Sequence, residues 1–563
     1  MKQWSLVLVA IIATITFLWR LGSIGLVDET EPLFAEASRQ MLGTGNWVTP
    51  YFNGETRFDK PPLVYWLMAV GYQVLGVNEW AVRLPSALSA MGLTLFLFLV
   101  MERFGVSAMT SSQSVQRRWS SLIAGVTLAL APEFMIWARV GVSDLLLTGC
   151  MGGALLCFFV GYVESEKVEE KPFFSLSFPS GWYLSFYVLI ALAVLAKGPV
   201  GLVLPGLIII AFLLYQGKLW SVVKEMRVIS GTILFLVITI PWHILIIIEN
   251  GEDYIASFFG YHNVERFTSV VNEHGAPWYF YFLVVLIGFA PLSVYLPSAI
   301  AQLQVWRRRF WHNQPRHQQL GLFAFFWFTV IFVFFTIAVT KLPSYIIPLL
   351  PAAAILLGLF WGHYQTETIS KGLIINGIIN VIFALVLAGA FYYSPNWIGY
   401  DPAAPNLGEV YAKSRLNIVA AIIWSVAAVL MVIALIRQPY RRWLWGINLL
   451  AMLLTFIFVL EPAVSLMDEV RQQPLRELAQ LEVTEEEVIM IGMKKPSVVF
   501  YRQQNVEFFS DVESAIAHLE AQPDHESQLI LSHPRHLKKI EQQAEITRLE
   551  TKGEYQLARV HKN

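Results

Sequence analysis

Acidic side chains are concentrated directly after the first apolar segment, in the stretch VDETEPLFAEASRQML. Asp28, Glu29, Glu31 and Glu36 all fall within it. A carboxylate beside a water-filled cavity at the membrane boundary can accept a proton from an attacking hydroxyl group. This pattern makes Asp28, or its neighbour Glu29, a candidate general base. A purely structural alternative is a helix start, with Asp28 as the N-cap and Glu31 at the third helical position, as in a capping box.

Two cations precede a pair of prolines in the stretch RFDKPPLVYW. The prolines block helix continuation and fix the local backbone, so Arg57 and Lys60 are held near the membrane boundary. These cations suit an anionic ligand such as a phosphate, with Lys60 as a point charge and Arg57 as a planar donor. Snorkelling toward lipid headgroups is the alternative explanation for a lysine at this depth.

Three further stretches place ionisable groups at the ends of apolar segments: ARVGVSDLLLTG, AKGPVG and TKLPSYIIPLLP. The first contains Arg139 and Asp144, which are either functional or form a structural ion pair with each other. Each of the other two contains a lysine shortly before a proline, Lys197 and Lys341. These lysines would add two cations around one outer cavity.

A later polar loop contains residues of the types that bind metals. Between positions 250 and 278 the sequence has His262, Glu265, Arg266, Glu273 and His274, without a pair of histidines at ligand spacing. A divalent metal ion therefore stays open, and the sequence predicts no other cofactor.

The elements that must position these side chains are membrane spans. Of the 563 residues, 56% are hydrophobic and 14% are charged, a composition typical of a membrane protein. Apolar runs of about 17–25 residues predict about thirteen transmembrane helices. They begin near Ser5, Leu84, Ser120, Asp144, Trp182, Val200, Val228, Trp278, Gly321, Tyr345, Gly372, Asn417 and Trp443. A formal net charge of -1 gives no support to nucleic-acid binding.

After residue 460 short β-prone runs alternate with helical stretches, which predicts a small soluble α/β domain over residues 461–563. Residues 1–460 form the predicted membrane domain, whose first external loop covers residues 27–83. Four basic loops, around positions 103–118, 218–227, 307–309 and 437–442, favour one orientation with the N-terminus in the cytoplasm. In that orientation the first loop and the α/β domain both lie outside, which predicts a multi-pass plasma (inner) membrane protein with a periplasmic or outer active site.

The ordered set of motifs resembles a known family. The stretches DETEPLFAEASRQML, GNWVTPYFNGETRFDKPPLVYW and NEWAVRLPS, followed by RVGVSD, KGP and KLPSY, are similar to polyprenyl-phosphate-sugar-dependent glycosyltransferases of the aminoarabinose transferase (ArnT) and protein O-mannosyltransferase group. The resemblance implies the GT-C fold, in which a transmembrane bundle carries outer helices and a soluble α/β domain on the same side.

The resemblance also implies roles for individual residues. Asp28 matches the family's catalytic acidic residue, Lys60 the residue near the carrier phosphate, and Asp144 the second acidic residue of the site. Arg139, Tyr65 and Tyr345 match by position. The chain departs from the aminoarabinose transferases after DET, where Glu31 and Pro32 replace their usual Arg-Tyr pair. The carrier contacts of that pair therefore do not transfer to this chain, and the sugar and acceptor stay open.

The predicted function is transfer of a sugar from a polyprenyl-phosphate carrier to an external lipid, glycan or protein acceptor, with inversion at the anomeric carbon. The alternative from another class is a secondary transporter or flippase of a lipid-linked or polar substrate, which would also show broken spans and membrane acids. The candidate charges lie at outer span ends rather than at the bilayer midplane, and the chain has no paired halves, so the transferase is favoured. A membrane receptor would leave the first loop unexplained.

Overall fold

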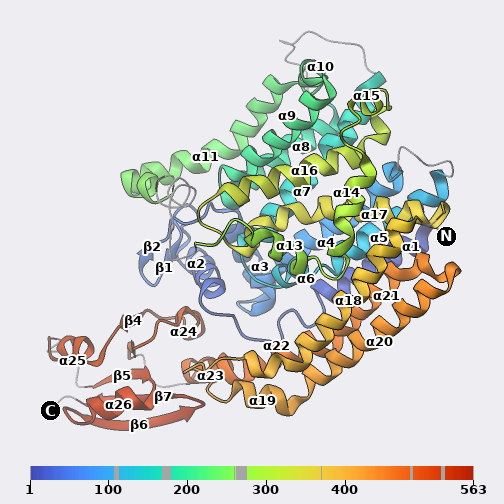
Figure 1. The fold of residues 1–563 in the computed structure, drawn as a ribbon. Helices are drawn as coiled ribbons and strands as arrows, with labels where there is room; N and C mark the ends of the chain where they lie inside the picture. The colour runs from blue at the N-terminus through green and yellow to red at the C-terminus, as the bar shows by residue number, and fades with distance from the viewer. Residues whose placement is uncertain are drawn as a thin grey trace.

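A computed structural model describes residues 2–106, 113–167, 179–258, 260, 275–368, 370–481, 486–521 and 527–561. Helices make up most of these residues and form one large body, with a small sheet at one end of it (Figure 1). The mostly helical membrane architecture with a C-terminal α/β domain is therefore confirmed.

The N-terminal half of the helical body contains the predicted first loop. Its helices are α1 (Lys2–Phe17), α2 (Thr30–Thr44), α3 (Leu63–Leu75), α4 (Glu79–Phe104), α5 (Gln113–Ala129), α6 (Pro132–Ala138), α7 (Ser143–Glu164), α8 (Gly181–Lys197), α9 (Val200–Gln216), α10 (Leu219–Glu225) and α11 (Val228–Tyr254). A two-stranded hairpin, β1 (Tyr51–Phe52) and β2 (Glu55–Thr56), lies between α2 and α3. The first loop is thus built of α2, the hairpin and α3.

The C-terminal half continues the helical body. Its elements are α13 (Phe280–Gly288), η3 (Leu292–Tyr295), α14 (Leu296–Leu303), α15 (Arg308–His312), α16 (Leu320–Ile337), η5 (Pro343–Leu349), α17 (Leu350–Thr366), α18 (Lys371–Tyr393), η6 (Ser394–Trp397), α19 (Leu407–Ser414), α20 (Leu416–Ile436), η7 (Gln438–Trp443) and α21 (Leu444–Thr455). α18 and α20 run side by side along one flank, as Figure 1 shows.

Helices α7 and α17 form the centre of the bundle, because most of their residues are buried inside the protein. Helix α17 packs on α5, and α7 packs on α4 and α8. In contrast, only 22–33% of the residues in the most apolar stretches of α11, α18 and α20 are buried inside the protein. An apolar helix that is not covered by protein must face lipid tails rather than water.

The predicted number of spans is not confirmed. Each of the thirteen predicted segments coincides with helical structure, but within the described ranges eight helices are long and apolar enough to cross a membrane. The number rises to ten when two bent pairs, α5 with α6 and α13 with α14, are each counted as one span. The predicted segments at α1, α8 and α9 are apolar helices of at most 17 residues, which is short for a span.

The C-terminal domain has a five-stranded sheet with the order β4-β3-β5-β7-β6. The strands are β3 (Val488–Ile491), β4 (Val506–Phe509), β5 (Ser527–Ser532), β6 (Glu545–Lys552) and β7 (Tyr555–His561). β3 pairs in parallel with both β4 and β5, whereas β7 runs antiparallel to β5 and β6. Helices connect the parallel strands, as their crossovers require.

Both faces of this sheet are covered, which explains why β3 reads as an uninterrupted apolar run. Val488 and Met490 face α23 (Gln473–Ala479) and α24 (Pro496–Arg502). Ile489 and Ile491 face α25 (Val512–Ala521) and α26 (Pro534–Ile540) on the other side. Alternate side chains of a strand point to opposite faces, so two separate small cores form.

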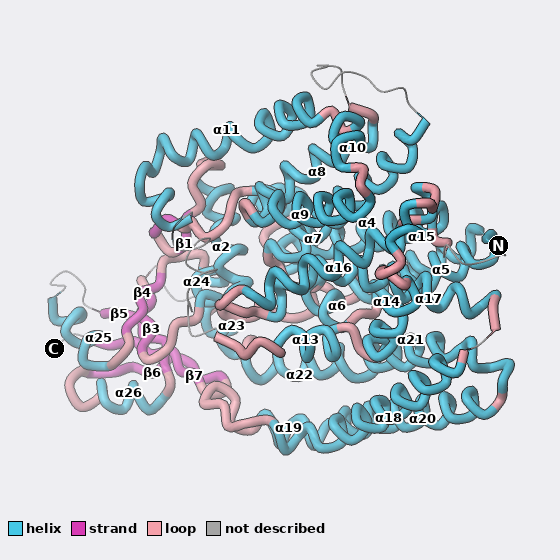
Figure 2. The backbone as a smooth tube through the Cα atoms, turned by 45° about the horizontal axis from the view of Figure 1, so that its top comes forward, coloured by secondary structure: helices cyan, strands magenta, loops and turns pink. Residues whose placement is uncertain are grey.

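One nearly continuous helical path joins the bundle to the sheet. α21 passes through a π-helical turn, η8 (Phe456–Leu460), directly into α22 (Glu461–Arg471) and then α23. α24 lies on the side of the domain that faces the bundle and contacts α2 of the first loop (Figure 2). The domain is therefore attached to the bundle through both its connecting helix and the first loop.

Candidate active site

The Asp28 carboxylate lies at the junction between the first loop and the C-terminal domain. Its Oδ1 accepts a hydrogen bond of 2.9 Å from the Ser497 backbone N–H, and its Oδ2 accepts one of 2.7 Å from the Ser497 hydroxyl. The Gln472 side chain, with its amide nitrogen turned toward them, donates to Asp28 Oδ2 at 3.2 Å and to the Leu26 carbonyl at 3.3 Å. Burial raises the pKa of Asp28, and the hydrogen bonds from Ser497 oppose this rise. A carboxylate with a raised pKa is a stronger proton acceptor.

The capping-box alternative for Asp28 is wrong. α2 begins at Thr30, its N-cap position is Glu29, and no side chain makes a capping hydrogen bond there. The Asp28 carboxylate instead reaches the C-terminal domain. Glu29 is exposed and close enough to raise the pKa of Asp28 through like-charge repulsion.

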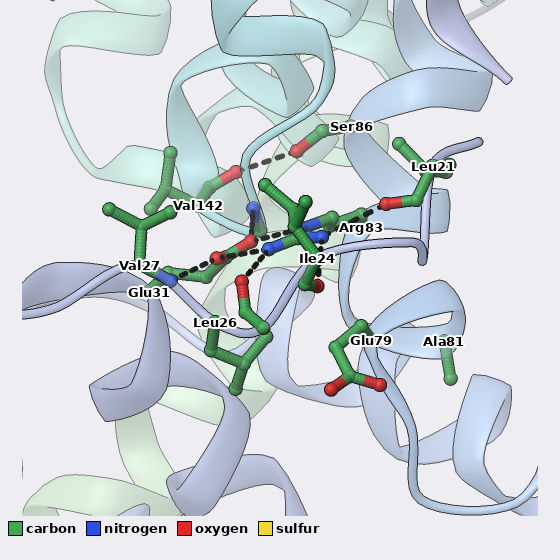
Figure 3. Close-up of polar contacts among 12 residues, drawn as sticks. Leu21, Ile24, Leu26, Val27, Glu31, Glu79, Ala81, Arg83, Ser86 and Val142 are labelled. Carbon is green, nitrogen blue, oxygen red and sulfur yellow. Dashed lines mark hydrogen bonds and ion pairs between the residues drawn. The ribbon is translucent and has the colours of Figure 1, made fainter. Parts of the chain in front are cut away.

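Glu31 has a different structural role, shown in Figure 3. Its carboxylate forms a two-fold contact with Arg83 of α4, at 2.8 and 2.9 Å, and both side chains are only 1% exposed. The same carboxylate accepts from the backbone N–H groups of Val27 and Gly141, at 2.9 and 2.7 Å. One buried acid thus ties the first loop to α4 and to the turn before α7.

Arg83 completes this network by fixing the backbone that leads to Asp28. Its guanidinium donates to the carbonyl oxygens of Leu21, Ile24 and Gly25, at 2.8–3.0 Å (Figure 3). All five donors of a guanidinium lie in one plane, so these contacts hold a short loop segment in a single shape. The position of Asp28 therefore depends on the Glu31–Arg83 pair.

A second group of side chains surrounds Asp59 in the segment before α3. Arg57 donates to the Asp59 carboxylate at 2.7 Å, and Tyr65 donates to it at 3.1 Å. The Lys60 ammonium group lies 3.6 Å from the same carboxylate and donates to the Asp59 carbonyl at 2.7 Å. The ring of Tyr65 stacks on Phe34 of α2. The structure thus brings together Arg57, Lys60 and Tyr65.

A third group joins the N-terminal end of α7, the C-terminal end of α8 and η5. The Lys197 ammonium group contacts the Asp144 carboxylate at 2.6 Å and lies 5.4 Å from the centre of the Tyr345 ring. Both charged side chains are about 15% exposed. Asp144, Lys197 and Tyr345 are therefore neighbours.

The two remaining candidates contact other partners. Arg139 forms an ion pair with Glu461 at 2.5 Å and donates to the carbonyl oxygens of Thr16 and Trp19, so the alternative of an Arg139–Asp144 pair is wrong. Lys341 is buried and donates to the Ala338 carbonyl at 2.5 Å. Among the described residues, no hydrogen bond or ion pair connects Asp28 with the Asp59 group or with the Asp144 group.

The predicted polar loop lies outside the described residues, including His262, Glu265, Arg266, Glu273 and His274. In the part of the chain that the structure describes, no cluster of three or more His, Cys, Asp or Glu side chains is arranged to hold a metal ion.

Several residues of these groups escaped the sequence analysis. Asp59 could have been singled out, because an acid between two cations in RFDK is a local signal. Arg83 and Ser497 gave no such signal, because their partners lie 52 and 469 residues away in the chain.

Comparisons with known proteins agree with this architecture. Residues 59–245 match the sequence profile of the family described as dolichyl-phosphate-mannose-protein mannosyltransferase. Residues 481–563 match the profile of the cyanobacterial RgtA-type glycosyltransferase C-terminal domain. Both the part that contains Lys60, Asp144 and Lys197 and the part that contains Ser497 are thus similar to glycosyltransferases.

Several proteins that the chain matches over most of its length are named as arabinosyl transferases. The chain is 27% identical over 462 residues to an undecaprenyl phosphate-alpha-4-amino-4-deoxy-L-arabinose arabinosyl transferase of Pseudomonas fluorescens, a match that covers 80% of this chain and 73% of the relative. A second such transferase of the same species is 29% identical over 460 residues, which covers 78% and 77% of the two chains. Another relative, from Shewanella sediminis, is 27% identical and covers 75% and 70%.

Solved structures with this fold include ArnT from Cupriavidus metallidurans bound to undecaprenyl phosphate. The TM-score is 0.76 with 22% sequence identity, and the match covers 99% of this chain and 98% of the other. An oligosaccharyltransferase from Archaeoglobus fulgidus gives a TM-score of 0.51 with 11% identity, over 95% and 69% of the two chains. The profiles, the relatives and the fold together support an ArnT-like membrane glycosyltransferase of the GT-C type.

Proposed function

We propose that the protein transfers a sugar from a polyprenyl-phosphate carrier to an acceptor outside the plasma membrane, with Asp28 as the general base. The observation that carries this proposal is the environment of Asp28. Its carboxylate is half-buried, is oriented by hydrogen bonds on both oxygens and has a raised pKa. A general base needs this combination of fixed position and increased basicity.

In the proposed reaction the acceptor nucleophile attacks the anomeric carbon from the face opposite the phosphate. The new bond forms as the bond between the sugar carbon and the phosphate oxygen breaks, so the anomeric configuration is inverted. Asp28 orients the nucleophile and takes up its proton, and the electron pair of the broken bond leaves with the carrier phosphate. A phosphate is already a good leaving group, so it needs charge stabilisation rather than a proton donor.

The proposed phosphate-binding residues are Lys60, Arg57, Lys197 and Lys341. Arg57 and Lys60 both contact the carboxylate of Asp59, and Lys197 contacts the carboxylate of Asp144. Tight ion pairs in the free protein also hold the cations in place before the carrier arrives, which lowers the entropic cost of binding.

Undecaprenyl phosphate is the carrier that we infer for this chain. The arabinosyl transferases to which the chain is similar are named for an undecaprenyl phosphate donor, and one solved structure with the same fold contains undecaprenyl phosphate. The presence of Glu31 and Pro32 after DET leaves the transferred sugar and the lipid, glycan or protein acceptor to experiment.

The proposed orientation has Asp28 and the C-terminal domain on the periplasmic or outer side. A contact between two of the four basic loops supports it, because Trp119, next to Arg118, packs on Trp443, next to Arg442. Loops that touch one another lie at one end of the bundle, and clusters of Arg and Lys favour the cytoplasmic side. Residues 1–460 then serve as the membrane transferase domain and residues 461–563 as its outer domain, with α22 and α23 as the connection.

A donor panel tests the proposal against the transporter alternative. Purified full-length protein in proteoliposomes would receive radiolabelled undecaprenyl-phosphate sugars and a membrane-lipid acceptor fraction. Equal amounts of released undecaprenyl phosphate and labelled acceptor support the transferase. Movement of the intact labelled lipid across the bilayer without bond cleavage would support a flippase and overturn the proposal.

A further inference from the structure

The described donors to the Asp28 carboxylate come from outside the membrane domain's first loop. Ser497 contributes both a backbone N–H and a hydroxyl, and Gln472 contributes its amide. Ser497 lies in the first turn of α24, and Gln472 lies between α22 and α23. The C-terminal part of the chain therefore determines which directions the two carboxylate oxygens can face.

The Ser497 side chain is suited to hold another group in place, since it is only 1% exposed. The residue before α24, Lys495, makes no capping hydrogen bond with its side chain. Backbone N–H groups in the first turn of a helix have no partner within the helix. Asp28 supplies that partner from the other domain, so the two residues satisfy each other.

Neighbouring contacts fix the distance between the two domains at this point. The Leu26 N–H donates to the Tyr501 hydroxyl at 2.8 Å, and that hydroxyl donates to Glu79 at 2.8 Å. The Asn53 side chain exchanges two hydrogen bonds of 2.8 Å with the backbone of Val506 on the edge strand β4. These contacts involve residues before and after Asp28 in the chain and tie them to the C-terminal domain, so we expect that Ser497 cannot move away from Asp28 without breaking several of them.

We propose that Ser497 is a positioning residue for Asp28, so that the C-terminal domain completes the active site instead of acting only as an accessory part. This inference rests on the proposed role of Asp28. Ser497 does not touch the substrate. It holds the carboxylate so that the remaining lone pair of Oδ1 faces the acceptor, and it favours the ionised form of the carboxylate.

The proposal predicts the sign of a pH effect. The charged and titratable groups that act on Asp28 are Lys495, Glu29 and Tyr555, and the change Ser497→Ala alters none of these side chains. Loss of a hydrogen bond to the ionised form raises the pKa of a carboxyl group. Ser497→Ala therefore raises the pKa of Asp28, and the acidic limb of the activity profile moves to higher pH.

The test uses full-length protein with the variants Ser497→Ala and Ser497→Thr. The control is Ser514→Ala at the start of α25, because Ser514 also donates its backbone N–H to a carboxylate, that of Asp511, whereas its hydroxyl donates to the Asp511 backbone carbonyl. Two readouts are compared at pH values from about 4 to about 9, that is, from the ordinary pKa of a free carboxyl group to roughly two units above neutral pH. The first is turnover with the undecaprenyl-phosphate sugar that the wild-type protein uses. The second is modification of Asp28 by dicyclohexylcarbodiimide, which reacts with protonated carboxyl groups and is quantified by mass spectrometry.

In Ser497→Ala we expect kcat to fall about 10-fold with little change in KM, and both pH midpoints to rise by about one unit. Ser497→Thr should restore both values, and Ser514→Ala should behave like the wild type. If Ser497→Ala has the wild-type midpoints and kcat per folded molecule, and loses only thermal stability, Ser497 is a docking contact and the inference is overturned. If the wild-type protein shows no transfer with any donor, the proposed function fails instead, and the carbodiimide midpoints still decide whether Ser497 controls the protonation of Asp28.

Discussion

The Glu31–Arg83 pair allows a prediction that does not depend on the reaction. Arg83→Leu removes five hydrogen bonds, two to Glu31 and three to the carbonyl oxygens of Leu21, Ile24 and Gly25. It also leaves the Glu31 carboxylate in a site that is 1% exposed, with two backbone N–H groups as its described partners. Removal of one member of a buried ion pair typically costs about 3–5 kcal/mol, and we expect a loss of stability in this range.

The matched control is Arg103→Leu. Arg103 contacts Glu164 at 2.9 Å, but the two side chains are 56% and 40% exposed. Water screens such a pair, and its removal costs about 0–1 kcal/mol. The double variant Glu31→Leu with Arg83→Leu removes the uncompensated charge but leaves the backbone partners without hydrogen bonds, so it should recover only about 1–3 kcal/mol of the loss.

The assay is the fraction of folded protein that remains after heating in detergent at a fixed rate, because membrane proteins of this size often unfold irreversibly. We expect a clearly lower midpoint for Arg83→Leu, a partial recovery in the double variant and a nearly unchanged midpoint for Arg103→Leu. Equal midpoints for Arg83→Leu and Arg103→Leu would refute the view that the buried pair holds the first loop in shape.

Three further predictions concern the other groups. Lys60→Ala should weaken binding of undecaprenyl phosphate about 10-fold and Lys60→Arg should restore part of it, measured at fixed salt because exposed phosphate contacts are screened; equal affinities for all three proteins would remove Lys60 from the phosphate site. Lys197→Met should abolish transfer. The double variant Asp144→Lys with Lys197→Asp, which exchanges the two charges, should have the thermal stability of the wild type but no transferase activity; transfer by this double variant would indicate that the ion pair has only a structural role. Cysteines introduced at Glu55 and Glu513 should react with an impermeant maleimide from outside, against a low background from the two buried native cysteines; labelling only after the inner face is exposed would reverse the orientation.

The sequence was sufficient for the architecture, because hydropathy determines where a chain can cross a membrane. Segments such as 320–337 and 416–436 contain no charged residue, and the change of pattern after residue 460 predicted the α/β domain. The number of spans could not be obtained in the same way. A bend such as that of 115° between α13 and α14 depends on tertiary packing, which an apolar run does not report.

The active-site residues were predictable only where their partners are close in sequence. Arg57, Lys60 and Tyr65 lie within nine positions of one another and meet around Asp59. In contrast, Arg139 contacts Glu461 instead of the nearby Asp144. Proximity in sequence favoured the wrong partner, because the side chain of Arg139 points toward the start of α22.

The central claim is that Asp28 performs chemistry, and Asp28→Asn tests it most directly. Asn keeps the shape of the side chain, its oxygen can still accept from the Ser497 N–H, and the Ser497 hydroxyl can accept from its amide nitrogen, so the fold should persist. In single-turnover experiments with the donor that the wild-type protein uses, we expect the variant to bind undecaprenyl phosphate with wild-type affinity and to form no labelled acceptor. Transfer at the wild-type rate by Asp28→Asn would contradict the claim and remove Asp28 from the mechanism.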